Sequence, residues 1–211
     1  EIILRPYQFC NLSEVVVRDD DTAETLKEKV RLATILGTLQ STMTDFRYLR
    51  NIWKKNTEEE ALLGVSMTGI MDCKLTNGST GEAALGTLLE ALRTVAVDTN
   101  KEWASRLGVN QSAAITCVKP SGTVSQLTDS ASGIHPRFSE YYTRTVRADK
   151  KDPLATAMIE AGFPHEEDVM NTSNWVFSFP QKAPNKAVTV ESMGAMEQLK
   201  LWKVYQDSWC E

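Results

Sequence analysis

Short apolar runs alternate with longer segments of helical periodicity along most of the chain. A mostly apolar run at residues 62–70 is followed by a turn at 77–81, a long helical stretch expected over 82–107, and another apolar run at 113–117. Short apolar runs of this kind are typical of buried strands, and the long stretch has apolar positions at helical spacing. The alternation predicts a parallel or mixed α/β architecture, layered or closed.

The remaining elements follow the same pattern. An extended stretch reaches residues 15–17, and a helix begins at Thr22 with Asp21 as its expected N-cap. The acidic run Thr57-Glu-Glu-Glu60 predicts the start of a second, short helix. Two further strands are expected at 141–146 and 175–179, with a helix around 154–161 between them and a last helix at about 192–209.

Composition excludes several classes of function. The 211 residues are 42% hydrophobic and 24% charged, enough for one large domain or two small ones with a substantial core. The net charge of −5 comes with scattered lysines and arginines, and without a basic stripe we expect no nucleic-acid partner. No apolar run approaches the roughly 20 residues of a membrane-spanning helix, so no membrane association is expected.

The cysteines carry a further expectation. The chain has four, Cys10, Cys73, Cys117 and Cys210, far apart and without a CxxC pair or a histidine at ligand spacing. This spacing argues against a zinc site, and no metal site is expected. A cytoplasmic chain with reduced thiols is the simplest interpretation, in which a functional cysteine takes part in redox or radical chemistry.

One loop has the composition of an anion-binding site. In AITCVKPSGTVSQL, residues 114–127, an apolar run leads into Pro, Ser, Gly and Thr and then into a short helix. Small residues allow close approach of a ligand, and the N–H groups of a helix start attract anions, so Ser121, Gly122, Thr123 and Ser125 could hold a phosphate. No Gly-Lys-Ser/Thr follows, which excludes a Walker loop. The pattern alone favours a plain β-turn with Thr as helix N-cap.

Three other residues have no role that physical reasoning alone assigns. Glu1 has the composition of solvated surface, and Cys10 lies among apolar residues as core filling would. His135 lies in a Ser-Gly-Ile-His-Pro bend, where a histidine is more often a loop residue than a ligand.

The opening segment EIILRPYQFCNL closely resembles the segment that follows the radical cysteine of ribonucleotide reductases, and is most similar to the adenosylcobalamin-dependent class. In that family a Cys-x-Glu motif stands at the tip of a loop inside a ten-stranded α/β barrel, and a second cysteine follows. Glu1 matches the glutamate of the motif and Cys10 the second cysteine. Their separation of nine residues fits the cobalamin class better than the iron-dependent class, whose corresponding span is longer.

Further segments in the same order carry the resemblance along nearly the whole chain. They are LLGVSMTGIMD at 62–72, VKPSGTVSQL at 118–127, SGIHPRFSEYYTRTVR at 132–147 and LWKVYQDSWCE at 201–211. The resemblance implies that residues 1–211 form the C-terminal part of a single catalytic barrel domain, incomplete without an N-terminal portion. Whether that portion is a separate chain, a processed product or the upstream part of the same chain is left open.

The resemblance also implies a mechanism. Adenosylcobalamin would generate a thiyl radical on an upstream cysteine, the radical would remove the 3′ hydrogen of a ribonucleotide, and Glu1 would take the 3′-hydroxyl proton. Cys10, paired with an earlier cysteine, would supply two electrons and be reset by thiol–disulfide exchange. The implied phosphate-binding residues are Pro120, Ser121, Gly122, Thr123, Val124 and Ser125. His135 is a candidate for the active-site or cofactor loop.

The partners follow from this assignment. They are an N-terminal portion carrying the radical cysteine and the effector site, a ribonucleotide substrate, and a thiol reductant such as thioredoxin. The chain alone is expected to be inactive. Three alternatives stay open: the large subunit of an iron-dependent reductase, a non-catalytic nucleotide- or phosphate-binding α/β module, and a structural half-barrel that exposes open sheet edges.

Overall fold

The computed structural model describes residues 2–211, which divide into two compact units. The first unit runs to Arg137 and resumes at Asn185–Glu211, and the second unit is Phe138–Pro184. Glu1, the predicted general base, lies outside the described residues. Strands and helices alternate in both units, so the predicted mixed α/β class is confirmed. The closed ten-stranded barrel and the single catalytic domain spanning 1–211 stay predictions.

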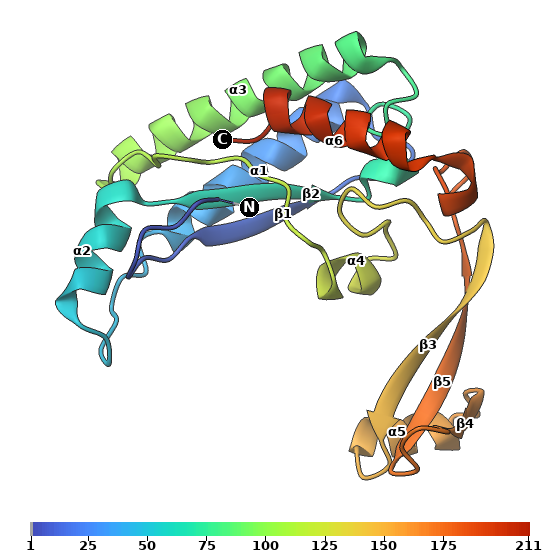
Figure 1. Ribbon diagram of the computed structural model, residues 1–211. Helices are drawn as coiled ribbons and strands as arrows, with labels where there is room; N and C mark the ends of the chain where they lie inside the picture. Colours follow the sequence, from blue (N-terminus) through green and yellow to red (C-terminus); the bar gives the residue numbers. More distant parts are fainter. Residues whose placement is uncertain (1) are drawn as a thin grey trace. The chain divides into compact units, whose positions relative to one another are not determined.

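A parallel pair of strands is the centre of the first unit (Figure 1). Strand β1 (Asn11–Val16) pairs with β2 (Leu63–Thr68) from Asn11↔Leu63 to Val16↔Thr68. The expected strand at 113–117 contributes one isolated parallel bridge, Val65↔Thr116, rather than a full strand. Its main chain still hydrogen-bonds to β2, with Val65 N donating to Ile115 O at 2.8 Å and Cys117 N to Val65 O at 3.0 Å.

Helices cover one face of this sheet. They are α1 (Ala23–Gln40), α3 (Glu82–Leu107) and α6 (Ala195–Ser208); α1 packs on β1 and β2, α3 on α1, and α6 on α3. Helix α3 has the predicted bounds. Residue 22 rather than 21 is the N-cap of α1: the Thr22 side chain accepts from Thr25 N, while the Asp21 carboxylate pairs with Lys29.

The prediction for the acidic run was wrong in direction. The run ends helix α2 (Asn51–Glu60) instead of beginning a helix, and Ala61 terminates it in the left-handed conformation with φ 43°. The other short helical segments of the first unit are η1 (Ile70–Asp72), α4 (Thr123–Leu127) and η2 (Val190–Ser192).

The core of the first unit lies between the sheet and the helices. Every residue of β2 is buried, and alternate residues Leu63, Val65 and Met67 belong to the cluster that also holds α1, α3 and α6 side chains. Residues two apart in a strand share a face. Full burial of an aliphatic side chain contributes about 1.5–3 kcal/mol, so this face stabilises the fold, and the other face of β2 is available for a site.

The second unit is an antiparallel sheet with a short helix (Figure 1). Strands β3 (Tyr141–Asp149) and β4 (His165–Glu167) flank β5 (Asn174–Lys182). Helix α5 (Pro153–Glu160) begins with Pro at its first position, and the Asp152 side chain accepts from Leu154 N. The expected strands and helix of this region are confirmed, each within a few residues.

The length and polarity of the helices show whether any of them could span a membrane. Within residues 2–211, none of the helices is both long enough and apolar enough to cross a bilayer.

Candidate active site

The second face of β2 is built from small residues. Gly64, Ser66 and Thr68 alternate with the three core-facing side chains. Thr68 Oγ1 donates to Ala131 O at 2.9 Å and accepts from Gly133 N at 3.0 Å. Ser66 Oγ accepts from Lys119 N at 3.0 Å. This face therefore anchors two loops, which we call the phosphate-loop candidate (residues 119–125) and the 130–135 loop.

Cys10 lies on the same face, one residue before β1. Its thiol is half-buried, and its Sγ is 3.3 Å from the point where a Cβ on Gly64 would stand. Cys117 Sγ is 3.4 Å from the same point, and Leu12 Cδ2 is 2.5 Å from it. A side chain at position 64 would displace these groups, so the glycine leaves room for both sulfurs. Cys117 is buried in an apolar cluster with Ile2 and Leu62, consistent with its interpretation as a packing residue.

The segment leading to Cys10 is held against α2. Phe9 stacks on Trp53 with ring centroids 4.8 Å apart. Gln8 is buried, and its Nε2 donates to Glu60 Oε2 at 2.6 Å. Tyr7 has φ 61°, a strained conformation for an aromatic residue that persists only where the surroundings enforce it. These contacts fix the chain immediately before the thiol.

The phosphate-loop candidate uses its two serines internally. Ser121 is buried, and its Oγ donates to Glu14 Oε2 at 3.1 Å. Ser125 Oγ donates to Ser121 O at 2.8 Å and to Gly122 O at 2.9 Å. Four other residues of the predicted site are exposed, namely Pro120, Gly122, Thr123 and Val124.

Helix α4 begins at Thr123, with Gly122 at the N-cap position and no side-chain cap. The expectation that Thr caps this helix was therefore wrong. An uncapped helix start leaves main-chain N–H groups as the donors for an anion, in place of the serine hydroxyls.

A buried ion pair supports both loops. Arg137 Nε and Nη2 donate to the two Asp72 carboxylate oxygens at 2.9 Å each, and both side chains are 3% exposed. Asp72 Oδ2 also accepts from Ala131 N at 2.8 Å. Ser132 Oγ hydrogen-bonds Ser121 O, so the 130–135 loop contacts the phosphate-loop candidate directly.

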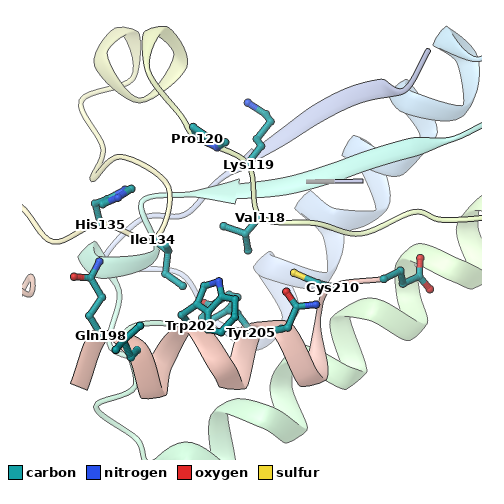
Figure 2. Close-up of a pocket in the computed structure, with 12 residues that line it drawn as sticks. Val118, Lys119, Pro120, Ile134, His135, Gln198, Trp202, Tyr205 and Cys210 are labelled. Atoms are coloured by element: carbon teal, nitrogen blue, oxygen red, sulfur yellow. The ribbon is translucent and has the colours of Figure 1, made fainter. Parts of the chain in front are cut away.

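His135 borders a pocket between these loops and α6 (Figure 2). The pocket has a volume of about 380 Å³, and Figure 2 shows Val118, Pro120 and His135 on one side and Trp202 of α6 on the other. The His135 ring is exposed, with Nδ1 3.1 Å from Ser132 O.

Two titratable groups line the same pocket. Tyr205 is fully buried and donates its hydroxyl to Thr76 O at 2.9 Å; burial raises its pKa far above the ordinary value. Burial also raises the pKa of the Cys210 thiol. Both groups are therefore protonated at neutral pH.

The structure brings most of the predicted residues together. Cys10 and the phosphate-loop candidate lie on one face of the sheet, and Pro120 and His135 line one pocket. Sequence reasoning missed two charged residues at this site: Glu14 on β1 and Lys119 at the start of the phosphate-loop candidate, whose Oε1 and Nζ are 3.2 Å apart. A signal for Glu14 existed, since a residue of an extended segment that follows Cys10 by an even number of positions lies on the same face as Cys10.

The chain resembles known proteins both in sequence and in structure. No family model matches the chain. It is 31% identical, over 210 residues, to an adenosylcobalamin-dependent ribonucleoside-triphosphate reductase of Lactobacillus gasseri, covering 88% of this chain and 28% of that protein. A probable reductase of the same name from Dictyostelium discoideum is 27% identical over 224 residues, covering the whole chain and 27% of the relative. The curated homologues of this chain are adenosylcobalamin-dependent ribonucleotide reductases. The resemblance inferred from the sequence is confirmed.

The structural comparison agrees. A crystal structure of a B12-dependent, class II ribonucleotide reductase superposes with a TM-score of 0.79 at 24% identity, covering 98% of this chain and 32% of that one. The chain therefore has the fold of the matching third of that enzyme. It spans less than a third of the length of the two curated relatives named above.

Proposed function

We propose that this chain is a C-terminal part of the ten-stranded catalytic barrel of an adenosylcobalamin-dependent ribonucleotide reductase. The observation that carries the proposal is that Cys10 and the phosphate-loop candidate share one face of the sheet, on which Glu14 of β1 accepts a hydrogen bond from Ser121 of the loop. Such a face can place a reducing thiol and a phosphate-binding loop around one nucleotide. The relatives' names make a ribonucleoside triphosphate the proposed substrate.

The proposed chemistry divides between this chain and the N-terminal portion. An upstream thiyl radical removes the 3′ hydrogen and Glu1 accepts the 3′-hydroxyl proton. The C2′–O bond breaks and the hydroxyl leaves as water. Cys10 and its upstream partner thiol lose two electrons and two protons as their disulfide forms, and the 3′ hydrogen is returned to the substrate. A thiol reductant such as thioredoxin then reduces the disulfide by exchange.

The phosphates are proposed to bind at the exposed start of α4. The main-chain N–H groups of Gly122, Thr123 and Val124 are the donors there, since Ser121 and Ser125 direct their hydroxyls elsewhere. Ser121 and Ser125 instead keep the loop in shape. Pro120, with its ring exposed, gives the loop a fixed entry direction.

Adenosylcobalamin, when bound, would supply the radical. The residues around His135 fit only part of such a group: a pocket of about 380 Å³ has the size for a nucleoside and is too small to enclose a corrin ring. His135 and Pro120 are therefore proposed to contact an edge of the cofactor at most.

Replacement of Cys10 tests the proposal. In the intact reductase, Cys10→Ser is expected to abolish multiple turnover with an external thiol reductant while leaving nucleotide binding intact, because serine cannot form the disulfide. Cys73→Ser is the matched control, because Cys73 is a buried thiol in the helix-facing core. Undiminished turnover of Cys10→Ser would refute the assignment. Nucleotide binding without any reduction by the wild type would favour the non-catalytic module.

A further inference from the structure

A carboxylate is buried directly beneath the phosphate-loop candidate. Glu14 lies on β1, its side chain is 5% exposed, and its Oε2 accepts from Ser121 Oγ at 3.1 Å. Its Oε1 is shielded from solvent. Glu14 therefore holds the loop in place through its hydrogen bond with the Ser121 side chain.

This arrangement is electrostatically unfavourable for an anion-binding loop. A buried negative charge is screened less than one at the surface, so it would repel a polyphosphate bound at the same loop. Burial of an unpaired carboxylate is also costly in itself. A nearby positive charge can offset both effects.

Lys119 supplies that charge. Its Nζ is 3.2 Å from Glu14 Oε1, and its side chain is only 14% exposed. Its main-chain N–H donates to Ser66 Oγ at 3.0 Å, which fixes the residue on β2. The ion pair thus joins β1, β2 and the loop at one point.

We propose that Lys119 is a positioning residue for substrate binding. It neutralises Glu14, so that the carboxylate can hold Ser121 and the loop without repelling the substrate phosphates. This inference rests on the proposed function, and it adds two residues to the site whose role is to make the loop accept a polyanion.

Three variants of the intact reductase test it. Lys119→Met keeps the aliphatic stem and leaves Glu14 uncompensated, so KM for the ribonucleoside triphosphate should rise about tenfold or more, with a much smaller change in kcat. Lys119→Arg retains the cation and should leave KM within about threefold of the wild type. The double variant Glu14→Gln/Lys119→Met has no charge to compensate and keeps an amide oxygen for Ser121, so KM should return to within about threefold of the wild type.

A matched ion pair provides the control. Lys29 Nζ is 2.6 Å from Asp21 Oδ2, and the Asp21 side chain is 5% exposed, as Glu14 is. Because this pair lies at the start of α1 and not at the loop, Lys29→Met should leave KM unchanged. Circular dichroism and the thermal midpoint of each variant report whether it is folded.

The recovery by the double variant decides the question. A purely structural role predicts that the double variant is at least as impaired as Lys119→Met, and this result would overturn the proposal. So would an unchanged KM in Lys119→Met. Should Lys119→Met not fold, Glu14→Gln serves as the reference: removing Lys119 in that background must not raise KM tenfold. Normal reduction by the wild type with any of these contrary results rejects only this inference, whereas a wild type that reduces no ribonucleotide rejects the proposed function as well.

Discussion

In the first unit, the charged side chains nearest the candidate site are buried in pairs, whereas in the second unit they lie mostly at the surface. Arg137 and Asp72 are each 3% exposed, and Glu14 and Lys119 are 5% and 14% exposed. The Arg147 side chain, which pairs with Asp168, is 59% exposed. Lys150 and Glu167 form another ion pair, and solvent reaches both of these side chains.

The strands differ in the same way. Every residue of β2 is buried, whereas every residue of β3 is exposed or half-buried. A parallel sheet is normally covered on both faces, and an antiparallel sheet can leave one face to water. The first unit therefore holds its loops in place with buried charges, which are costly to disrupt, whereas the more exposed ion pairs of the second unit contribute less to stability.

Removal of Arg137 should have the largest effect. Arg137→Met leaves Asp72 buried without its bidentate partner, and loss of one member of a buried pair costs about 3–5 kcal/mol. The free energy of unfolding, measured by urea titration, checks this. A loss comparable to that of a surface pair would show that water reaches Asp72 and would break the comparison.

Removal of the Tyr205 hydroxyl should have an intermediate effect. Tyr205→Phe keeps the ring but leaves the buried acceptor Thr76 O without this donor, at a cost of about 1–3 kcal/mol. The control in the second unit is Tyr141→Phe, at a side chain 62% exposed, which should stay within about 0.5 kcal/mol of the wild type. Equal losses at the two positions would contradict the distinction between the units.

Removal of Arg147 should have the smallest effect at neutral pH. Its pair with Asp168 is open to solvent on the Arg side, so Arg147→Met should change the free energy of unfolding less than Tyr205→Phe does. A loss as large as that of Arg137→Met would reverse the ranking of the units.

The Asp168 carboxylate, the partner of Arg147, makes the stability of the second unit depend on pH. The main-chain N–H of Met170, and then Arg147, hold the pKa of Asp168 below its usual value. Because the pKa is lower in the folded state, the contribution is present above the unfolded value of about 4 and is lost as pH falls through that value toward the folded one. The protection of β5 amides against hydrogen exchange, measured relative to the intrinsic exchange rate at each pH, should therefore fall in acid, and Asp168→Asn should weaken that dependence.

Elements bounded by strong local signals were predictable. Helix α3 lies between Gly81 and Gly108, and Gly108 ends it at φ 71° in the left-handed conformation that glycine favours. Strand β2 was visible as an apolar run. Strands β3 and β5 of the second unit were also predictable, since both combine β-branched and aromatic residues between turns, whereas the three-residue strand β4 (His165–Glu167) was not predicted.

Elements that depend on distant contacts were not predictable. Helix α2 begins at Asn51 without a side-chain cap, and Trp53 packs on Phe9, which is remote in sequence. The acidic run at residues 57–60 therefore has the composition of a helix start, but it forms the C-terminal end of α2. The segment at 113–117 forms one bridge with β2, Val65↔Thr116, and Thr116 O accepts from Glu211 N, 95 residues later in the chain.

The site shows the same division. Local composition indicated the loop around Ser121, but the direction of the hydroxyl depends on Glu14, 107 residues earlier. The family resemblance indicated Cys10, but no local signal in the sequence indicated that Gly64 lies beside it. Small residues on alternate positions of a buried strand indicate that something packs there, but do not say what.

The last turn of the first unit has a consequence for how the chain folds. Thr116 Oγ1 donates to Trp209 O across 93 residues, and Trp209 Nε1 donates to Cys117 O at 2.8 Å. Contacts between residues so far apart form late, because the entropy of closing the intervening loop is lost before the contacts compensate for it. During synthesis the edge of the sheet at Thr116 and Cys117 therefore stays uncovered until α6 has left the ribosome. In that interval the nascent chain presents an open strand edge, the kind of surface that chaperones shield.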